Sequence, residues 1–168
     1  MPTPLNMNKR AVLLASLFAA LAPAVALAAD TPPPPPPPSA PAKPADPLTG
    51  AREHIQAKRW AAAMGELQRV NAGNSADWNN LMGYVLRKQA APDLDGAQRH
   101  YDAALRINPQ HKGALEYSGE LALMRGNLPQ AEERLASLGR VCSSNCEELD
   151  DLKKGIERYK ANGNRYTP

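Results

Sequence analysis

Apolar side chains recur at helical spacing between residues 60 and 138, and one arrangement of them repeats at a fixed interval of 34 residues. Each copy combines an alanine with apolar residues four and seven positions later, so all three side chains share one helix face. The three copies are Ala63, Leu67 and Val70; Ala97, Tyr101 and Ala104; and Ala131, Leu135 and Leu138. A repeat of this length is typical of stacked helical hairpins, because one hairpin cannot bury its apolar face without a neighbour. The pattern therefore predicts an all-α domain.

Turn-forming and capping residues divide this region into short helices. Ser75 and Asp93 stand just before apolar-periodic stretches and are expected to be N-caps. Pro47 suits the first turn of the opening helix. Gly126 stands where a helix can end in a left-handed conformation. The other expected breaks are at 58–60, 71–75, 90–93 and 108–109.

A last helix is predicted after the cysteine-containing turn. Residues 144–147, with the sequence Ser-Asn-Cys-Glu, predict a capping box at its start, and Gly163 is expected to end it. Its apolar positions are Leu149, Leu152, Ile156 and Tyr159. Charged residues cover its other face, so we expect it to cap the C-terminal end of the domain. The helical domain is therefore predicted to span 48–162, followed by a flexible tail at 163–168.

The first 28 residues are typical of a secretory signal peptide. Lys9 and Arg10 precede an apolar run over 11–27, and the small-x-small pattern Ala-Leu-Ala ends at Ala28. We expect cleavage near Ala28, and therefore a periplasmic or secreted protein with no membrane span after processing. A retained anchor is the alternative, but the apolar run is short for a bilayer span.

Residues 29–47 are dominated by proline, with an unbroken run from Pro32 to Pro38. Proline fixes φ and lacks a backbone donor, so we predict a disordered linker of extended polyproline II character, without a fold of its own. We interpret it as a tether or stand-off arm. A ligand for a proline-binding domain is the alternative.

The charge balance excludes two classes of partner. The chain has 20 basic and 17 acidic residues, a formal net charge of +3. Without Lys9 and Arg10 the balance becomes 18 minus 17, or +1. Proteins that bind nucleic acid or anionic membranes usually carry a stronger positive field. We therefore expect no nucleic acid and no membrane surface as a partner.

Two sets of small side chains make the repeats resemble the tetratricopeptide repeat (TPR) family. With the expected signal peptide, the chain resembles an exported bacterial TPR protein. The family's eighth position holds Ala51, Gly83 and Gly119 in this chain, and its twentieth position holds Ala63, Ala97 and Ala131. Small residues there let helix axes approach closely. The resemblance covers about residues 46–145. It implies a right-handed superhelical stack of about three TPR-like helix-turn-helix repeats plus a C-terminal capping helix.

The resemblance also implies a concave groove lined by the first helix of each repeat. Together with the expected signal peptide, it leads us to expect that this groove binds a peptide or helix of a cell-envelope protein. The family's groove positions carry Arg52, Asn80, Tyr84, Arg87, Lys88, Glu116 and Glu120 in this chain. Asn80 would hydrogen-bond the partner's backbone, and Tyr84 would pack against one of its side chains. Arg87 and Lys88 would meet a carboxylate. The alternative is that these residues only solvate the inner face.

Cys142 and Cys146 are the only two cysteines. An oxidising compartment favours their pairing, so we predict a disulfide between the last repeat and the capping helix. A thiol-redox site is the sharper alternative, because Cys146 is expected in the first turn of a helix, where the pKa of a thiol is lowered. A metal site is the third reading of the pair.

No pattern points to catalysis or to a cofactor. His54, His100 and His111 make no metal-ligand spacing, and we expect them to be solvated residues on helix faces. The chain also lacks a phosphate-binding glycine loop and a nucleophile elbow. We therefore predict a binding protein that is not an enzyme and has no cofactor or metal, with its oligomeric state left open. A thiol-redox protein and a self-assembling spacer are the alternatives.

Overall fold

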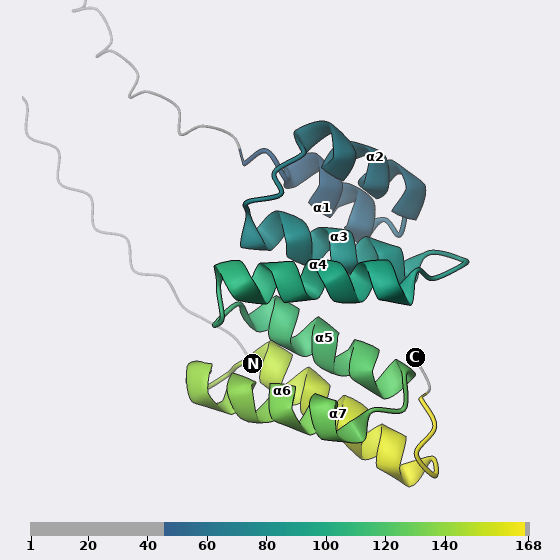
Figure 1. The fold of residues 1–168 in the computed structure, drawn as a ribbon, viewed down its shortest axis with the longest axis vertical. Helices are drawn as coiled ribbons and strands as arrows, with labels where there is room; N and C mark the ends of the chain where they lie inside the picture. Colours follow the sequence, from purple (N-terminus) through teal and green to yellow (C-terminus); the bar gives the residue numbers. More distant parts are fainter. Residues whose placement is uncertain (1–45, 167–168) are drawn as a thin grey trace, which may run out of the picture. The chain divides into compact units, whose positions relative to one another are not determined.

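The computed structural model describes residues 46–166, and this part of the chain consists of seven helices with no strand (Figure 1). The predicted all-α class is therefore confirmed. The helices are α1 (Thr49–Gln56), α2 (Trp60–Val70), α3 (Ala76–Lys88), α4 (Leu94–Ile107), α5 (Lys112–Met124), α6 (Leu128–Val141) and α7 (Glu147–Ala161). The predicted signal peptide, the predicted linker up to residue 45 and residues 167–168 lie outside the described residues. None of the described helices is both long enough and apolar enough to cross a bilayer.

The local signals for helix starts and ends are confirmed at several positions. At the start of α3, Ser75 Oγ accepts a hydrogen bond from the Trp78 backbone N–H at 3.2 Å. At the start of α4, Asp93 Oδ1 accepts one from the Gly96 N–H at 2.8 Å. These caps satisfy N–H groups that have no partner within their own helix. Gly126 has a φ of 73°, the left-handed conformation predicted for the end of α5.

The start of α1 differs from the prediction. The helix begins at Thr49 after the N-cap residue Leu48, so Pro47 lies outside the first turn and that prediction is wrong. Asp46 Oδ1 accepts a hydrogen bond from the Leu48 N–H at 3.0 Å. The turn before the helix is thus closed by an acidic side chain, a frequent role of aspartate.

The start of α7 also differs. Cys146 is its N-cap residue and no side chain caps the helix, so the capping box predicted at 144–147 is wrong. A disulfide joins Cys142 to Cys146, as predicted, with their Cα atoms 5.7 Å apart. Asn145, between them, has a φ of 63°. This closed, left-handed turn leads the chain into α7 at Cys146 and leaves Ser144 outside the capping position.

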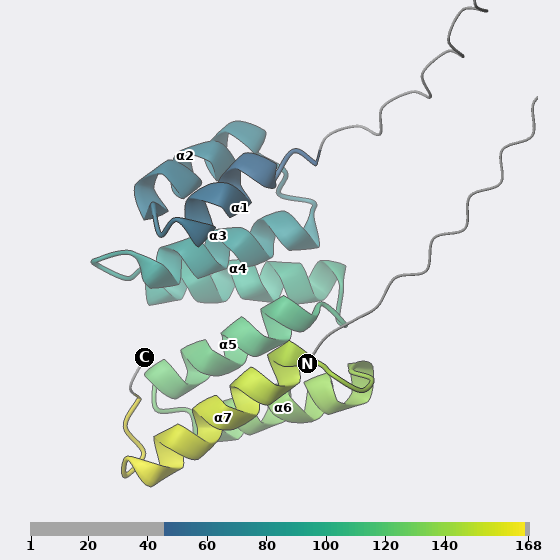
Figure 2. The ribbon, with the colours of Figure 1, turned by 180° about the vertical axis from the view of Figure 1, so that it is seen from behind.

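The helices form two layers, with the odd-numbered helices on one side and the even-numbered helices on the other (Figure 1, Figure 2). Helix α1 contacts α3, α3 contacts α5, and α5 contacts α7. Among the described helices, by contrast, no Cα of α2 lies within 8 Å of α4, and none of α4 within 8 Å of α6. The odd-numbered helices are therefore the more closely packed layer. We call the surface of the odd-numbered helices that faces away from the even-numbered layer the odd-helix face.

Two glycines explain how closely neighbouring helices approach. A Cβ on Gly83 of α3 would lie 2.7 Å from Cε1 of the Tyr101 ring on α4. A Cβ on Gly119 of α5 would lie 2.6 Å from Cδ2 of Leu152 on α7. Both distances are shorter than van der Waals contact allows, so a larger residue would force the helices apart. These are the positions at which the sequence predicts a need for small side chains.

The buried apolar residues form three clusters along the domain. One lies between α1, α2 and α3 around Leu67, whose carbonyl oxygen accepts a 2.7 Å hydrogen bond from Trp78 Nε1. The second lies between α3, α4 and α5 around Tyr101. The third lies around Leu152 and joins α5, α6 and α7. Each cluster is shared between neighbouring helix pairs, which ties the pairs into one domain.

Candidate functional site

A buried ion pair joins α3 to α5. Arg87 Nη2 lies 2.6 Å from Glu120 Oε2, and the two side chains are 1% and 19% exposed. A buried guanidinium needs such a partner, because an unpaired charge that is removed from water costs several kcal/mol. The pair therefore fixes α3 against α5 in the middle of the odd-numbered layer.

Three tyrosine rings surround this ion pair. Arg87 Cζ lies 5.5 Å from the ring centroids of both Tyr84 and Tyr117, within the range of a cation–π interaction. The centroids of these two rings are 4.7 Å apart, and the Tyr101 ring lies 6.4 Å from that of Tyr117. We call the five residues the Arg87 cluster: Tyr84, Arg87, Tyr101, Tyr117 and Glu120.

The surroundings keep Arg87 charged and the tyrosines neutral. Burial lowers the pKa of Arg87, but the nearby oxygens of Tyr101 and Glu120 raise it by more, so the net change is upward. Burial raises the pKa of Tyr101 and of Tyr117 above the usual tyrosine value. Among the described residues, the Tyr101 hydroxyl and both Nε and Nη2 of Arg87 have no well-directed hydrogen bond. Charge attraction and ring packing therefore hold the cluster together.

Aromatic surface continues from the Arg87 cluster to α2. The Trp60 ring lies 6.1 Å from the Tyr84 ring in an edge-on arrangement. Lys88 Nζ lies 5.7 Å from the Tyr84 centroid, and burial together with the charge of Arg87 lowers the pKa of Lys88. An apolar cleft of about 510 Å³ is lined by Trp60, Ala61, Met64, Gln89, Ala90 and Ala91. This end of the face thus combines an apolar cleft with a lysine.

Tyr117 also lines a small pocket between α5 and α7, with a volume of about 180 Å³. Its other lining residues are all acidic, and we call it the acidic pocket: Glu116, Glu147, Glu148 and Asp151. Glu116 is only 8% exposed, and in the described part of the chain it makes no hydrogen bond or ion pair. Burial, with repulsion from Glu120, raises the pKa of Glu116 to about 8. Arg87 lowers this pKa by less than the other groups raise it.

Most of the predicted groove residues lie together at this face. Those joined by the contacts above are Tyr84, Arg87, Lys88, Glu116 and Glu120. Arg52 instead pairs with Asp46 and Asp77, at 3.6 and 3.7 Å. Asn80 is buried, and its Oδ1 has no hydrogen-bond partner among the described residues.

The surroundings of Arg87 change the role that the sequence suggests for it. The resemblance implies that Arg87 meets a partner's carboxylate, whereas the carboxylate that it meets belongs to Glu120 of the same chain. Its side chain is also almost completely buried. Lys88, by contrast, stays partly exposed at this end of the face.

The sequence reasoning missed several residues of the site. Tyr117 on α5 is not among the predicted groove residues, and neither are Glu148 and Asp151 on α7. Glu148 and Asp151 are three residues apart, so both carboxylates lie on one face of α7, and this spacing could have indicated the site. Tyr166 falls in the predicted flexible tail, yet it packs against the third apolar cluster and lies close enough to Arg87 to influence its pKa. No local pattern indicates this last contact.

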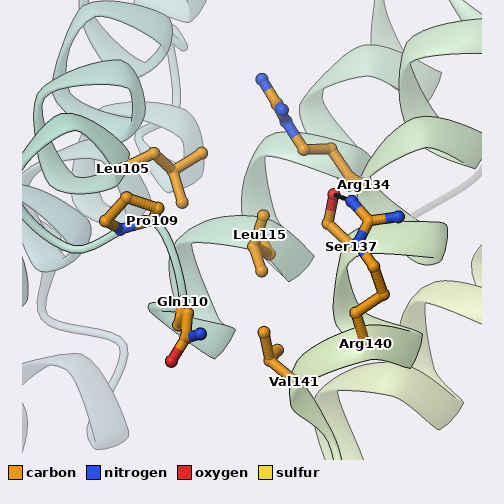
Figure 3. Close-up of a pocket in the computed structure, with 8 residues that line it drawn as sticks. All are labelled: Leu105, Pro109, Gln110, Leu115, Arg134, Ser137, Arg140 and Val141. Carbon is orange, nitrogen blue, oxygen red and sulfur yellow. Dashed lines mark hydrogen bonds between the residues drawn. The ribbon is translucent and has the colours of Figure 1, made fainter.

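A second cleft of about 510 Å³ lies between the end of α4, the start of α5 and α6 (Figure 3). Its lining is part apolar and part polar: Leu105, Pro109, Gln110, Leu115, Arg134, Ser137, Arg140 and Val141. Arg140 Nη2 donates a 2.9 Å hydrogen bond to Ser137 Oγ. Arg134 Nε has no hydrogen-bond partner among the described residues. The cleft was not predicted, because its residues come from three helices without a common motif.

Two of the three histidines have specific partners, so the expectation that they are simply solvated is wrong for them. His100 Nδ1 lies 3.0 Å from Asn79 Oδ1. His111 Nδ1 accepts a hydrogen bond from the Ala114 N–H at 3.1 Å and so caps α5. His111 Nε2 lies 2.9 Å from Asp77 Oδ1, which ties α5 to α3. Within residues 46–166, no three histidine, cysteine or acidic residues are grouped so that they could hold a metal ion.

Comparison with known proteins identifies no relative. No protein-family model matches the chain, and no match is found among curated proteins or solved structures.

Proposed function

We propose that residues 46–166 form a TPR-like, right-handed superhelical stack that serves as a protein-interaction module of the cell envelope. Its partner is an extended peptide or a helix of another envelope protein, bound along the odd-helix face. Location outside the cytoplasm follows from the predicted signal peptide with cleavage near Ala28. The predicted proline-rich linker acts as a tether for the module.

The observation that supports this proposal best is an aromatic surface on a rigid base. Trp60, Tyr84 and Tyr117 are each partly exposed, and their rings form a connected series. The ion pair of Arg87 and Glu120 lies against two of these rings and fixes their helices. Aromatic side chains that are partly exposed and held in one orientation are typical of protein-binding surfaces, since little entropy is lost on contact.

The charges give the surface a direction. Lys88 lies beside Tyr84, and the acidic pocket lies beside Tyr117. A bound segment with an acidic residue near Lys88 and a basic residue at the acidic pocket is favoured over the reverse orientation. The odd-helix face, together with the adjoining Trp60 ring of α2, therefore has apolar, basic and acidic parts in sequence.

Site-specific photo-crosslinking tests the proposal. We would replace Tyr84 with a photoreactive phenylalanine analogue in the full chain and irradiate it in the native compartment. A single dominant protein adduct is expected, because the partner covers this ring. The matched control carries the same analogue at Arg106, an exposed position on α4. Equal adduct patterns from both positions would contradict binding at the odd-helix face.

Truncation of the same ring provides a quantitative test. Tyr84→Ala removes a central aromatic contact, and such a loss typically costs about 2 kcal/mol of binding free energy, or roughly 30-fold in affinity. The measurement is titration of the crosslinked partner, once isolated, against wild type and variant. Arg106→Ala should leave the affinity within about twofold.

A further inference from the structure

Glu116 is a buried carboxyl group whose negative charge is not compensated within the described part of the chain. It is 8% exposed and makes no hydrogen bond or ion pair there. Arg87, the cation that acts on it, is already paired with Glu120. Its carboxyl oxygens are not fully enclosed by protein, because the residue lines the acidic pocket. A partner for its charge can therefore reach it through that pocket.

The groups that face Glu116 come from three helices, and most of them are acidic. Those that repel its charge or share its pocket are Glu120, Glu147, Glu148 and Asp151. Arg87 of α3 attracts its charge, but its influence on the pKa of Glu116 is smaller than that of Glu120. The local field thus disfavours a second negative charge and favours a positive one.

The start of a helix explains only part of this arrangement. The first turn of α7 carries Glu147, Glu148 and Asp150, and acidic residues are stabilised there by the helix dipole. Glu116 belongs to α5 and stands beyond its first turn, so it has no such stabilisation from its own helix. Helix stability accounts for the acids of α7, whereas it does not account for Glu116.

The pocket fits the end of one long cationic side chain. Its volume of about 180 Å³ can hold a guanidinium or ammonium group with part of its stem, and the Tyr117 ring lines it. A guanidinium presents several N–H donors that can meet more than one carboxylate, and it packs well on an aromatic ring. The pocket residues are not grouped as metal ligands.

We propose that the acidic pocket receives an arginine or lysine side chain of the bound partner, and that Glu116 is the carboxylate that pairs with its cation. The inference rests on the proposed function, because the pocket adjoins Tyr117 of the odd-helix face. As the cation enters, the Glu116 carboxyl group releases its proton to solvent and becomes the counter-ion. The partner is thereby restricted to segments with a basic residue at this position.

The probe for this site is N-acetyl-arginine amide, with the isosteric and neutral N-acetyl-citrulline amide as its control. Glutamate labelled with ¹³C at the side-chain carboxyl group reports the pKa of Glu116 by NMR. Saturation with the arginine probe is expected to lower that pKa by at least about one pH unit, as a nearby opposite charge does. The citrulline probe should leave it unchanged. N-acetyl-lysine amide should act as the arginine probe does.

Two charge-matched variants isolate the carboxylate. Glu116→Gln keeps the size of the side chain and removes the charge, so affinity for the arginine probe should fall at least about tenfold at pH 9. Glu157→Gln removes one charge from an exposed position further along α7 and should change that affinity by less than about twofold. Both variants are compared by circular dichroism, so that loss of folding is not mistaken for loss of binding.

Several results would overturn the inference. A Glu116 pKa that stays unchanged when the arginine probe is added would exclude a cation pocket. So would a citrulline probe that lowers this pKa as much as the arginine probe does. A pKa lowered by calcium chloride but not by the arginine probe would indicate a metal site instead. If the crosslinked partner binds Glu116→Gln as tightly as wild type, the pocket inference fails while the proposed function stands. If Tyr84 gives no specific adduct but the arginine probe binds, the proposed function fails and the pocket remains.

Discussion

Glu116 and Glu120 lie one helical turn apart on α5, yet their charges have opposite environments. Glu120 is paired with Arg87 at 2.6 Å and helps to hold α3 against α5. Glu116 is more deeply buried than the Glu120 side chain and has no counter-charge of its own. The comparison shows that burial of a charge does not by itself reveal its role. What distinguishes the two sites is whether the fold supplies the opposite charge.

The difference arises from the helices on either side of α5. Helix α3 presents Arg87, together with the Tyr84 ring, to one part of α5. Helix α7 presents Glu148 and Asp151 to another part. The α3 side of α5, at Glu120, is therefore electrostatically complete, because its counter-charge lies within the fold. The α7 side, at Glu116, is incomplete, because only an added cation can supply its counter-charge.

Arg87→Met is expected to have the largest effect on stability. It removes the cation and leaves the mostly buried carboxylate of Glu120 without a partner, which typically costs about 3–5 kcal/mol. Urea unfolding followed by circular dichroism measures the free energy of unfolding. Arg106→Met, at an exposed position, should change it by less than about 0.5 kcal/mol.

The double variant Arg87→Met with Glu120→Leu distinguishes charge from packing. Replacement of both ions by apolar residues of similar volume is often neutral, so the double variant should recover most of the lost stability. If it stays as unstable as Arg87→Met alone, the cation–π packing of Arg87 between Tyr84 and Tyr117 is the main contribution.

Glu116→Gln tests the incomplete side through its pH dependence. The pKa of Glu116 is about 8 in the folded protein and near its ordinary value of 4.5 in the unfolded chain. Between these values the folded state holds a proton that the unfolded state has released. Wild-type stability is therefore fully present below the unfolded pKa and falls as pH rises toward about 8. Relative to wild type, the glutamine variant should gain about 4 kcal/mol between pH 5 and pH 9.

The measurement for Glu116→Gln is urea unfolding at pH 5, 7 and 9, with Glu157→Gln as the matched control on the surface of α7. The control should follow the wild-type pH dependence. Parallel curves for wild type and Glu116→Gln would show that the Glu116 carboxyl group has an ordinary pKa, and that the two sides of α5 do not differ as described.

Much of the fold was open to prediction because its signals are local. The recurrence of Ala63, Ala97 and Ala131 indicates helices with buried small positions, and each of these alanines is fully buried. Caps such as Ser75 and Asp93 are short-range features that single residues determine. Helix starts were mispredicted where a longer-range constraint acts, as at Cys146, where the disulfide and the turn before it override the capping box.

The candidate site was less predictable, because it depends on which helices become neighbours. The pattern places Arg87 and Glu120 on the same predicted groove, but it does not show that they neutralise each other across 33 residues of chain. The acidic character of the pocket depends on the packing of α7 against α5, because three of its four carboxylates come from α7. Periodicity identifies the buried face of a helix, whereas the charge that arrives opposite comes from tertiary packing.

Removal of the disulfide should weaken the acidic side selectively. Loop-closure entropy for so short a loop corresponds to about 2 kcal/mol, so Cys142→Ser with Cys146→Ser should lower the free energy of unfolding by about that amount. Because the turn positions the start of α7, the acids there should also move away from Glu116, and its pKa should fall toward the ordinary value. NMR titration of the variant checks this. A lower stability with an unchanged Glu116 pKa would show that other contacts position α7.

Gly119→Ala should give the smallest effect and the most local one. The added Cβ would meet Leu152 Cδ2 at 2.6 Å, and the flexible leucine can relieve only part of the overlap because it is buried. We expect a loss of about 1–2 kcal/mol. Gly139→Ala in α6 meets nothing within 4 Å and should instead stabilise the protein by about 0.5–1 kcal/mol through helix propensity.

The same pair of glycine variants also separates the two sides of α5. Gly119 lies between Glu116 and Glu120 in sequence, but its missing side chain faces α7. The alanine should therefore displace α7 and lower the pKa of Glu116, while the environment of the Tyr84 ring keeps its NMR signature. Since α3 supplies the charge for Glu120 and α7 supplies none for Glu116, disturbance confined to the α5–α7 contact should change the incomplete side only. Equal changes at both sides would mean that α5 responds as one unit and that the contrast between its two carboxylates is not set by its separate neighbours.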